Sequence, residues 1–113
     1  MPYISFKTTK VLTLQQELDL KKISGKIITL LPGKTEDYLM VHIEDNQLIY
    51  FKGKEVDCIM IDCQVYGHPD LESKQNFVRE LMKEVERITK IPVYNQYLTF
   101  EEKDEWGMNG ELI

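Results

Sequence analysis

The first residues of the chain, Met1-Pro2-Tyr3, carry the most unusual chemical group that the sequence offers. Removal of Met1 would leave Pro2 with a free secondary amine, and the proline ring would fix the direction of the nitrogen lone pair. An α-amino group has a pKa of about 7.7 to 8.0, and burial or a neighbouring cation lowers it. A base with a pKa close to 7 suits proton abstraction next to a carbonyl, so Pro2 is a candidate general base.

A proline at position 2 also has a plain explanation, because a proline at an exposed terminus needs no function. The first position of a strand tolerates proline, since no ladder hydrogen bond has to be donated there. The rest of the chain must decide between these two interpretations of Pro2.

Length and charge narrow the classes of protein to consider. The chain has 113 residues and a formal net charge of −5, with no basic tract. We expect a single domain over residues 1–113, and neither nucleic acid nor an anionic membrane surface as a partner. No apolar run approaches the roughly 18 residues of a membrane span, and no secretion signal is recognisable, so we expect the protein in the cytoplasm.

The cysteines and histidines do not form a metal-binding pattern. Cys58 and Cys63 fall in one predicted strand, on opposite faces and about 16 Å apart, so they cannot form a disulfide with each other. His42 and His68 have no ligand-like spacing to them. We expect no metal site.

The first half of the chain predicts a strand, a helix and a second strand. The strand covers residues 1–7, and the helix begins after Thr13, with Gln16 placed to complete a capping box. The helix ends at Leu31-Pro32-Gly33, and a strand follows at 38–44. The buried face of this first helix is predicted to carry Leu14, Leu18, Ile23, Ile27, Ile28 and Leu31.

The second half repeats this order. A strongly apolar strand at 58–65 leads into a helix, and residues 93–98 form the last long strand. A short strand is predicted at 48–51, and residues 101–110 read as a loop with one short extended piece. The buried face of the second helix is predicted to carry Leu71, Val78, Leu81, Met82, Val85 and Ile88.

Two β-α-β units predict an α+β sandwich: a four-stranded mixed sheet with both helices on one face. The opposite face is then bare. In the strand at 58–65, apolar residues occur at both odd-numbered and even-numbered positions and so on both faces, which is typical of a strand buried on both sides. We therefore expect other copies of the chain to cover the bare face, in a number that this argument leaves open.

Several short motifs occur in a characteristic order along the whole chain. They are Met1-Pro2, Gly33-Lys34, Tyr38 to His42, Gln47-Leu48, Tyr66-Gly67, Val93-Tyr94 with Tyr97, and Gly107-Met108-Asn109-Gly110. No single motif is specific, but the ordered set resembles the tautomerase superfamily. The most similar branch is that of macrophage migration inhibitory factor and D-dopachrome tautomerase.

The resemblance implies a ring-shaped homotrimer with active sites between neighbouring subunits. Pro2 would transfer the proton, Lys34 would hold the substrate carboxylate, and the backbone N–H of Tyr66 would donate to the same acid group. Tyr94 and Gln96 would complete the pocket from an adjacent subunit. Being two apart in a predicted strand, they are expected to share a face.

The sequence also departs from the family pattern around the expected pocket. Gln96 stands where asparagine is usual, and Tyr66 replaces a smaller aliphatic residue. Trp106 replaces a smaller residue, Met108 replaces an aromatic one, and Ile113 ends the chain where an aromatic residue is usual. Trp106 and Met108 are thus candidate residues of the pocket mouth, with aromatic surface redistributed around it.

The leading hypothesis is keto-enol tautomerisation of phenylpyruvate or a related small 2-oxo acid, for which no cofactor is needed. The alternative is a cytokine-like trimer that binds a protein partner and has a vestigial pocket, in which case secretion without a leader stays open. A third hypothesis is a monomeric ferredoxin-like domain that binds a small ligand or acts as a regulatory module.

Overall fold

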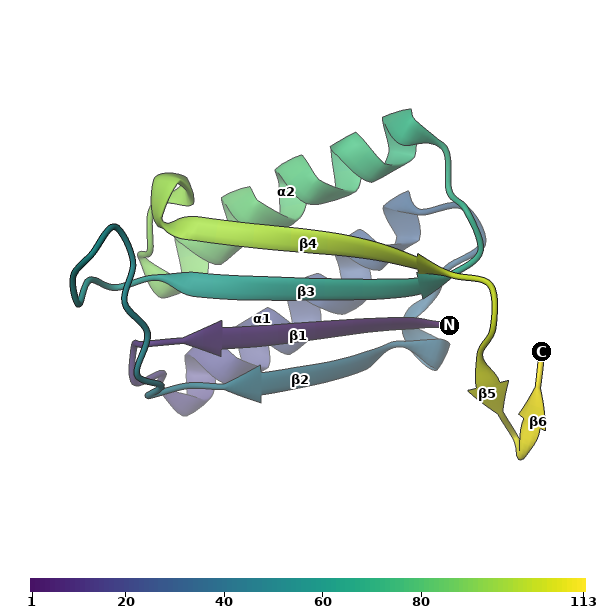
Figure 1. Ribbon diagram of the computed structural model, residues 1–113, viewed down its shortest axis with the longest axis horizontal. Coiled ribbons are helices and arrows are strands. Elements are labelled where there is room, and N and C mark those ends of the chain that lie inside the picture. Colours follow the sequence, from purple (N-terminus) through teal and green to yellow (C-terminus); the bar gives the residue numbers. More distant parts are fainter.

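The computed structural model describes residues 1–113 as a β-sheet with a pair of α-helices packed against it (Figure 1). In chain order the elements are β1 (Pro2–Thr8), α1 (Leu14–Ile27), β2 (Met40–Glu44), β3 (Ile59–Tyr66), α2 (Leu71–Thr89), β4 (Gln96–Lys103), β5 (Gly107–Met108) and β6 (Glu111–Leu112). Short 3₁₀-helices are η1 (Ile28–Leu30), η2 (Glu36–Tyr38) and η3 (Val93–Asn95). No helix combines the length and the apolar character needed to cross a membrane.

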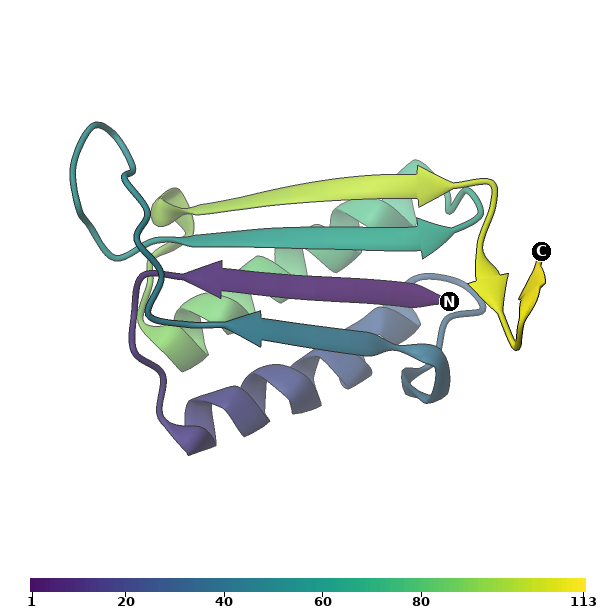
Figure 2. The ribbon, with the colours of Figure 1, turned by 60° about the horizontal axis from the view of Figure 1, so that its bottom comes forward.

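The main sheet is built from two β-α-β units, as predicted. Its strand order is β2-β1-β3-β4. Strands β1 and β2 are parallel, strands β3 and β4 are parallel, and the central pair β1 and β3 is antiparallel. Both helices lie on the same face of the sheet (Figures 1 and 2). The predicted four-stranded mixed sheet with one bare face is confirmed.

Helix α1 begins as predicted, but it buries a different stripe of residues. The N–H of Gln16 donates to the Thr13 hydroxyl at 3.1 Å, and the N–H of Thr13 donates to the Gln16 side chain at 2.9 Å. Leu14 and Leu18, predicted to be buried, are exposed. They lie roughly 100° or more around the helix from the buried stripe. That stripe and its continuation are Leu20, Ser24, Ile27, Ile28 and Leu31.

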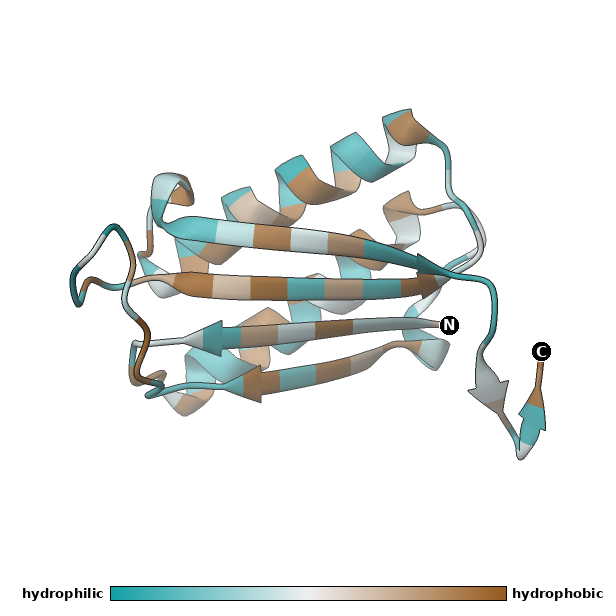
Figure 3. Ribbon diagram, viewed as in Figure 1, coloured by the Kyte–Doolittle hydropathy of each residue, from teal (hydrophilic) through white to brown (hydrophobic).

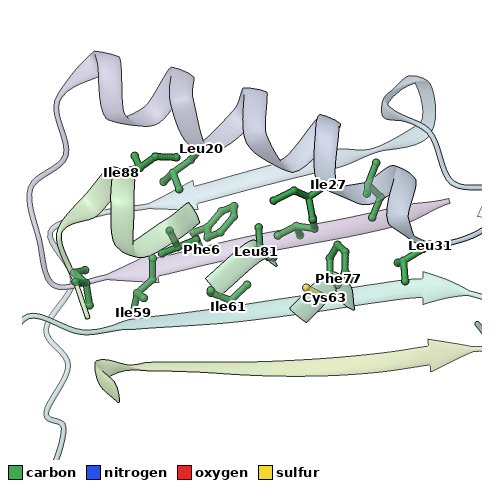
Figure 4. Close-up of a cluster of buried hydrophobic side chains, with 14 of the residues drawn as sticks. Phe6, Leu20, Ile27, Leu31, Ile59, Ile61, Cys63, Phe77, Leu81 and Ile88 are labelled. Atoms are coloured by element: carbon green, nitrogen blue, oxygen red, sulfur yellow. The ribbon is translucent and has the colours of Figure 1, made fainter. Parts of the chain in front are cut away.

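The hydrophobic core fills the space between the helices and the sheet (Figure 4). Phe77, Leu81 and Val85 supply the centre of the α2 face at helical spacing, and all three are fully buried. Phe77 was missed by the sequence prediction. Leu71 was wrongly predicted to be buried: it is 68% exposed, because it lies at the first position of the helix and to one side of this stripe.

Strand β3 has one buried face rather than two. Ile59, Ile61, Cys63 and Val65 point into the core, and the residues between them are only half-buried. Those residues alternate with the buried ones and include both apolar and polar side chains (Figure 3). In the single chain β3 is therefore buried on its helix side alone, and burial of its other side by further copies of the chain stays a prediction. The mixed bare face does not by itself require a covering subunit.

The segment between β2 and β3 forms a loop instead of the predicted strand at 48–51. Residues 45–57 project beyond the ends of the strands (Figure 2). Their only ladder contact is the bridge between Phe51 and Lys54. Asn46 and Lys52 have positive φ angles of 55° and 57°, which break the extended conformation on both sides of the apolar run.

Candidate functional site

Pro2 occupies the first position of β1, opposite Val65 near the end of β3. Pro2 is buried, and the residue before it, Met1, continues the pairing of β1 with β3. The N–H of Tyr66 donates to the carbonyl oxygen of Met1 at 3.2 Å. The carbon of that carbonyl is bonded to the Pro2 nitrogen. Removal of Met1 would therefore free the nitrogen and the Tyr66 N–H at the same place.

Lys34 lies beside this terminus. It follows a turn in which Gly33 has a φ of 78°, a conformation that glycine adopts without strain. The Lys34 Nζ donates to the carbonyl oxygen of Tyr66 at 2.7 Å. Burial lowers the pKa of the Met1 amino group, and the neighbouring Lys34 ammonium lowers that pKa further. The structure thus brings Pro2, Lys34 and the Tyr66 backbone together, while their chemical roles stay predictions.

Lys34 and Tyr66 also line a shallow cavity of about 320 Å³. The turn at 67–70, between β3 and α2, forms much of its wall. A larger hollow of about 690 Å³ lies between α2 and β4, with Val78 and Phe100 among its walls. The larger hollow includes neither Pro2 nor Lys34, so it is separate from the chemistry predicted at the N-terminus.

The structure contradicts the prediction that Tyr94 and Gln96 share a face. Tyr94 lies in η3, which follows Pro92, and its side chain is 70% exposed. Strand β4 therefore begins only at Gln96, whose side chain faces the helices and is 3% exposed. The Gln96 amide nitrogen donates to the carbonyls of Met82 and Ile91, at 3.1 and 3.0 Å. In the single chain Gln96 is thus a core residue that joins the start of β4 to α2 and to the segment after it, and a part in ligand binding stays a prediction.

Replacing Gln96 with alanine is expected to lower the free energy of unfolding by about 2 to 3 kcal/mol. The substitution removes the donor to the buried Ile91 carbonyl and a second hydrogen bond to the Met82 carbonyl, and it opens a cavity. Urea denaturation of Gln96→Ala measures the effect. Gln15→Ala, on the exposed side of α1, is the matched control and is expected to stay within about 0.5 kcal/mol of the wild type. Equal stabilities of the two variants would contradict the structural role of Gln96.

Tyr97 is the tyrosine that β4 presents on the bare face. Its side chain is 63% exposed and meets the ring of Phe51 edge to face, with 5.0 Å between ring centroids. Tyr97 pairs with Met60, five residues before Val65 on β3, so it lies about 17 Å along the sheet from Pro2. A residue of β4 at this position can approach a Pro2 site only in another copy of the chain.

Trp106 and Met108 lie at the end of the sheet where Pro2 lies. Met108 belongs to β5, which pairs with β6 in a small hairpin, and the N–H of Ile113 donates to the Trp106 carbonyl at 2.9 Å. Both Trp106 and Met108 are half-buried. The hairpin extends past the strand ends near the N-terminus (Figures 1 and 2). The sequence predicted a mostly irregular tail here and missed both the hairpin and the extension of β4 to Lys103.

No group of three His, Cys, Asp or Glu side chains is arranged to hold a metal ion. The candidate site at the start of β1 consists of the nitrogen of Pro2, the ammonium of Lys34 and the backbone of Tyr66. The lowered pKa is that of the Met1 amine. A Pro2 amine freed at this place would lie near the same Lys34 ammonium, which disfavours its protonation and can also hold an anion.

Comparisons with known proteins identify the fold. No protein-family model matches the sequence, and no curated protein sequence matches it. The MIF2 protein of Leishmania major is similar in structure, with a TM-score of 0.91 and 20% identity over 100% of this chain and 97% of that one. A macrophage migration inhibitory factor homologue from Prochlorococcus marinus has a TM-score of 0.86 and 23% identity, over 97% of each chain.

A third structure carries information about a ligand. It is that of Pt0534 inactivated by 2-oxo-3-pentynoate, with a TM-score of 0.80 and 18% identity over 96% of this chain and 93% of that one. All three similarities extend over nearly the whole of both chains, so they concern the complete arrangement of sheet and helices. The chain therefore has the fold of macrophage migration inhibitory factor and its structural relatives.

Proposed function

We propose that the chain, once Met1 is removed, catalyses keto-enol tautomerisation of a small 2-oxo acid such as phenylpyruvate. The observation that supports this proposal is the meeting of three groups at one end of the sheet. The Met1 carbonyl, which is bonded to the nitrogen of Pro2, accepts a hydrogen bond from the N–H of Tyr66. The Lys34 ammonium donates to the Tyr66 carbonyl and lies near the terminal amine. A base beside two donors of positive character is the arrangement that enolisation requires.

In the proposed reaction the neutral Pro2 amine takes a proton from the carbon next to the carbonyl. The electron pair of the broken C–H bond moves to form the C=C bond, and the carbonyl electrons move to oxygen. The Pro2 ammonium then returns its proton to that oxygen and gives the enol, and the reverse sequence gives the keto acid. Each step moves a proton between carbon, nitrogen and oxygen, so the reaction needs no cofactor.

Lys34 and Tyr66 have complementary parts in this proposal. The ammonium of Lys34 pairs with the substrate carboxylate, and the Tyr66 N–H, which Met1 no longer occupies, donates to the same acid group. The positive charge of Lys34 also disfavours protonation of the nearby amine, which keeps Pro2 a base at neutral pH. The inactivation of the structurally similar Pt0534 by a 2-oxo acid supports this class of substrate.

We propose that the functional form is a homotrimer with its sites between subunits. Within one chain Tyr97 and Phe51 lie at the far end of the sheet from Pro2, and Tyr97 is largely exposed. If a neighbouring copy placed its Tyr97 end against the N-terminus of this chain, its aromatic side chains would form one wall of the site. Tyr94, to which the sequence prediction gave this part, is also exposed at this end of the sheet, where Lys52 contacts the rings of both Phe51 and Tyr94. Tyr94 and Tyr97 are thus both candidates for that wall.

The proposal is tested with Lys34→Met in a chain whose loss of Met1 has been verified by intact mass. We expect kcat/KM for phenylpyruvate, followed by decay of the enol absorbance, to fall about 100-fold, because a charged donor to the substrate is lost. Lys22→Met, which removes an exposed lysine from α1, is the matched control and is expected to keep full activity. A fall of less than about threefold in Lys34→Met would contradict the role of Lys34.

A further inference from the structure

The turn at 67–70, which forms part of the cavity wall, is held to the end of β4 by the side chain of His68. The Nδ1 atom of His68 lies 2.5 Å from a carboxylate oxygen of Glu102, and the Nε2 atom lies 2.6 Å from a carboxylate oxygen of Asp104. The N–H of Gly67 donates to the carbonyl of Lys103 at 2.9 Å. The last two residues of β4 and the residue after it, Asp104, therefore contact Gly67 and His68 of the turn.

The geometry around His68 favours a protonated ring. Glu102 and Asp104 are acceptors when ionised, and neutral imidazole has only one N–H to donate. With neutral His68, one ring nitrogen would turn a lone pair toward a carboxylate oxygen. With imidazolium, both contacts become charge-assisted hydrogen bonds. The two carboxylates, Glu102 first, raise the pKa of His68 above its ordinary value.

Other charged groups surround this contact. From α2, the Lys74 ammonium lies 2.5 Å from the second carboxylate oxygen of Glu102, and this contact, followed by that of His68, lowers the Glu102 pKa. In the turn itself, Asp70 accepts hydrogen bonds from Ser73, which lower the Asp70 pKa. Lys34 lies on the same cavity wall, and Lys103 is paired with Glu101.

The turn matters because it directly follows Tyr66 and lines the same cavity as Lys34. We propose that protonated His68, bound between Glu102 and Asp104, is a positioning residue that holds the turn at 67–70 and thereby the Tyr66 backbone that receives the substrate acid group. The part of this inference that concerns substrate rests on the proposed function. The part that concerns the turn does not, because it follows from contacts within the chain.

The sign of the pH dependence follows from the direction of the His68 shift. A raised pKa means that the contact is fully formed below the pKa of a free histidine, about 6.5, and is lost as pH rises through the folded-state value. On the acid side the contact is lost when Glu102 is protonated, below its lowered pKa. The side-chain contact that holds the turn is therefore present below the raised pKa of His68 and lost above it.

The first test needs no substrate. In the complete protein, NMR titration should place the His68 midpoint above that of a free histidine, with the amide signals of Tyr66 and Gly67 moving at the same midpoint. Glu102→Gln should lower the His68 midpoint, while the signals of His42, which lies on the bare face of β2, provide the internal comparison. Amide signals of Tyr66 and Gly67 that stay still while His68 titrates would overturn the inference.

The second test measures turnover by the processed chain. We expect His68→Gln to raise KM for phenylpyruvate roughly 3- to 10-fold at pH 6.5 with kcat within about twofold, because ground-state positioning is lost while the base remains. The wild-type KM should rise as pH passes the His68 midpoint found by NMR, and this rise should disappear in the variant. His42→Gln is the matched control and should keep the wild-type KM. An unchanged KM in His68→Gln would overturn the role in substrate binding.

The two tests separate failure of the inference from failure of the proposed function. If the processed wild type does not turn over any 2-oxo acid, the proposed function fails and the NMR titration still decides whether His68 holds the turn. If turnover is present but the amide signals of Tyr66 and Gly67 do not shift as His68 titrates, the inference fails and the proposed function stands.

Discussion

A chain that retains Met1 is expected to turn over phenylpyruvate at about one-thousandth of the rate of the processed chain, or less. Met1 converts the Pro2 nitrogen into an amide, which has no basic lone pair. Its carbonyl also occupies the N–H of Tyr66, at 3.2 Å, so the retained residue blocks the base and a substrate donor together. Enol-decay assays on samples separated by intact mass measure the difference.

Pro2→Gly distinguishes the amine from the ring. The processed variant keeps a terminal amine but loses the ring that fixes the lone pair and supplies basicity, so we expect it to be crippled as well. Thermal unfolding of the Met1-retaining and processed chains is the control and should show that both are folded. Near-normal activity in a mass-verified Met1-retaining sample would refute the amine mechanism.

Phe77→Ala is expected to lower the free energy of unfolding by about 3 to 5 kcal/mol. Phe77 is fully buried at the centre of the core and meets Phe100 edge to face, with 5.9 Å between ring centroids (Figure 4). Its removal leaves a cavity that the surrounding helices and sheet can fill only in part. Denaturant titration followed by circular dichroism measures the loss.

The matched control for Phe77→Ala is Leu71→Ala on the same helix. Leu71 is largely exposed, and its truncation is expected to change stability by less than about 0.5 kcal/mol. A Leu71 variant as unstable as the Phe77 variant would mean that the buried face of α2 is the one predicted from the sequence, rather than the one described above.

The sequence predicted best those features that depend on local chemistry and on the order of elements. Thr13 and Gln16 form the predicted capping box because both partners of that motif lie within a single helical turn. The order of strands and helices specified two parallel crossovers, which pair β1 with β2 and β3 with β4. The start of β1 meets the end of β3 through the antiparallel pairing of these two strands, which the sequence analysis did not specify. The proximity of Pro2 and Tyr66 follows from that topology.

Side-chain directions in β4 were predicted wrongly because they depend on where the strand begins. The run from Val93 onward has strand-like residues, but Pro92 is followed by a 3₁₀ turn and the extended conformation starts at Gln96. Tyr94 therefore belongs to the turn and Tyr97 to the bare face. Only the start of the strand fixes which residues point toward the helices.

The loop at 45–57 shows the other limit of sequence patterns. Residues 48–51 have strand-like composition, yet the segment forms only one bridge, between Phe51 and Lys54. Strand formation requires a partner edge as well as suitable side chains. In α1, the sequence contained enough leucines for more than one apolar stripe, and packing against α2 and the sheet selected the one that includes Leu20.

The antiparallel ladder between β1 and β3 is the seam where the two halves of the molecule join. Each half has its own helix and its own parallel pair, so the backbone approximates a duplication. If one half unfolded alone, the inner strand of the other half would lose its hydrogen-bond partners, and the apolar side chains that both halves share would be exposed to water. The repeats are consequently bound into one cooperative folding unit.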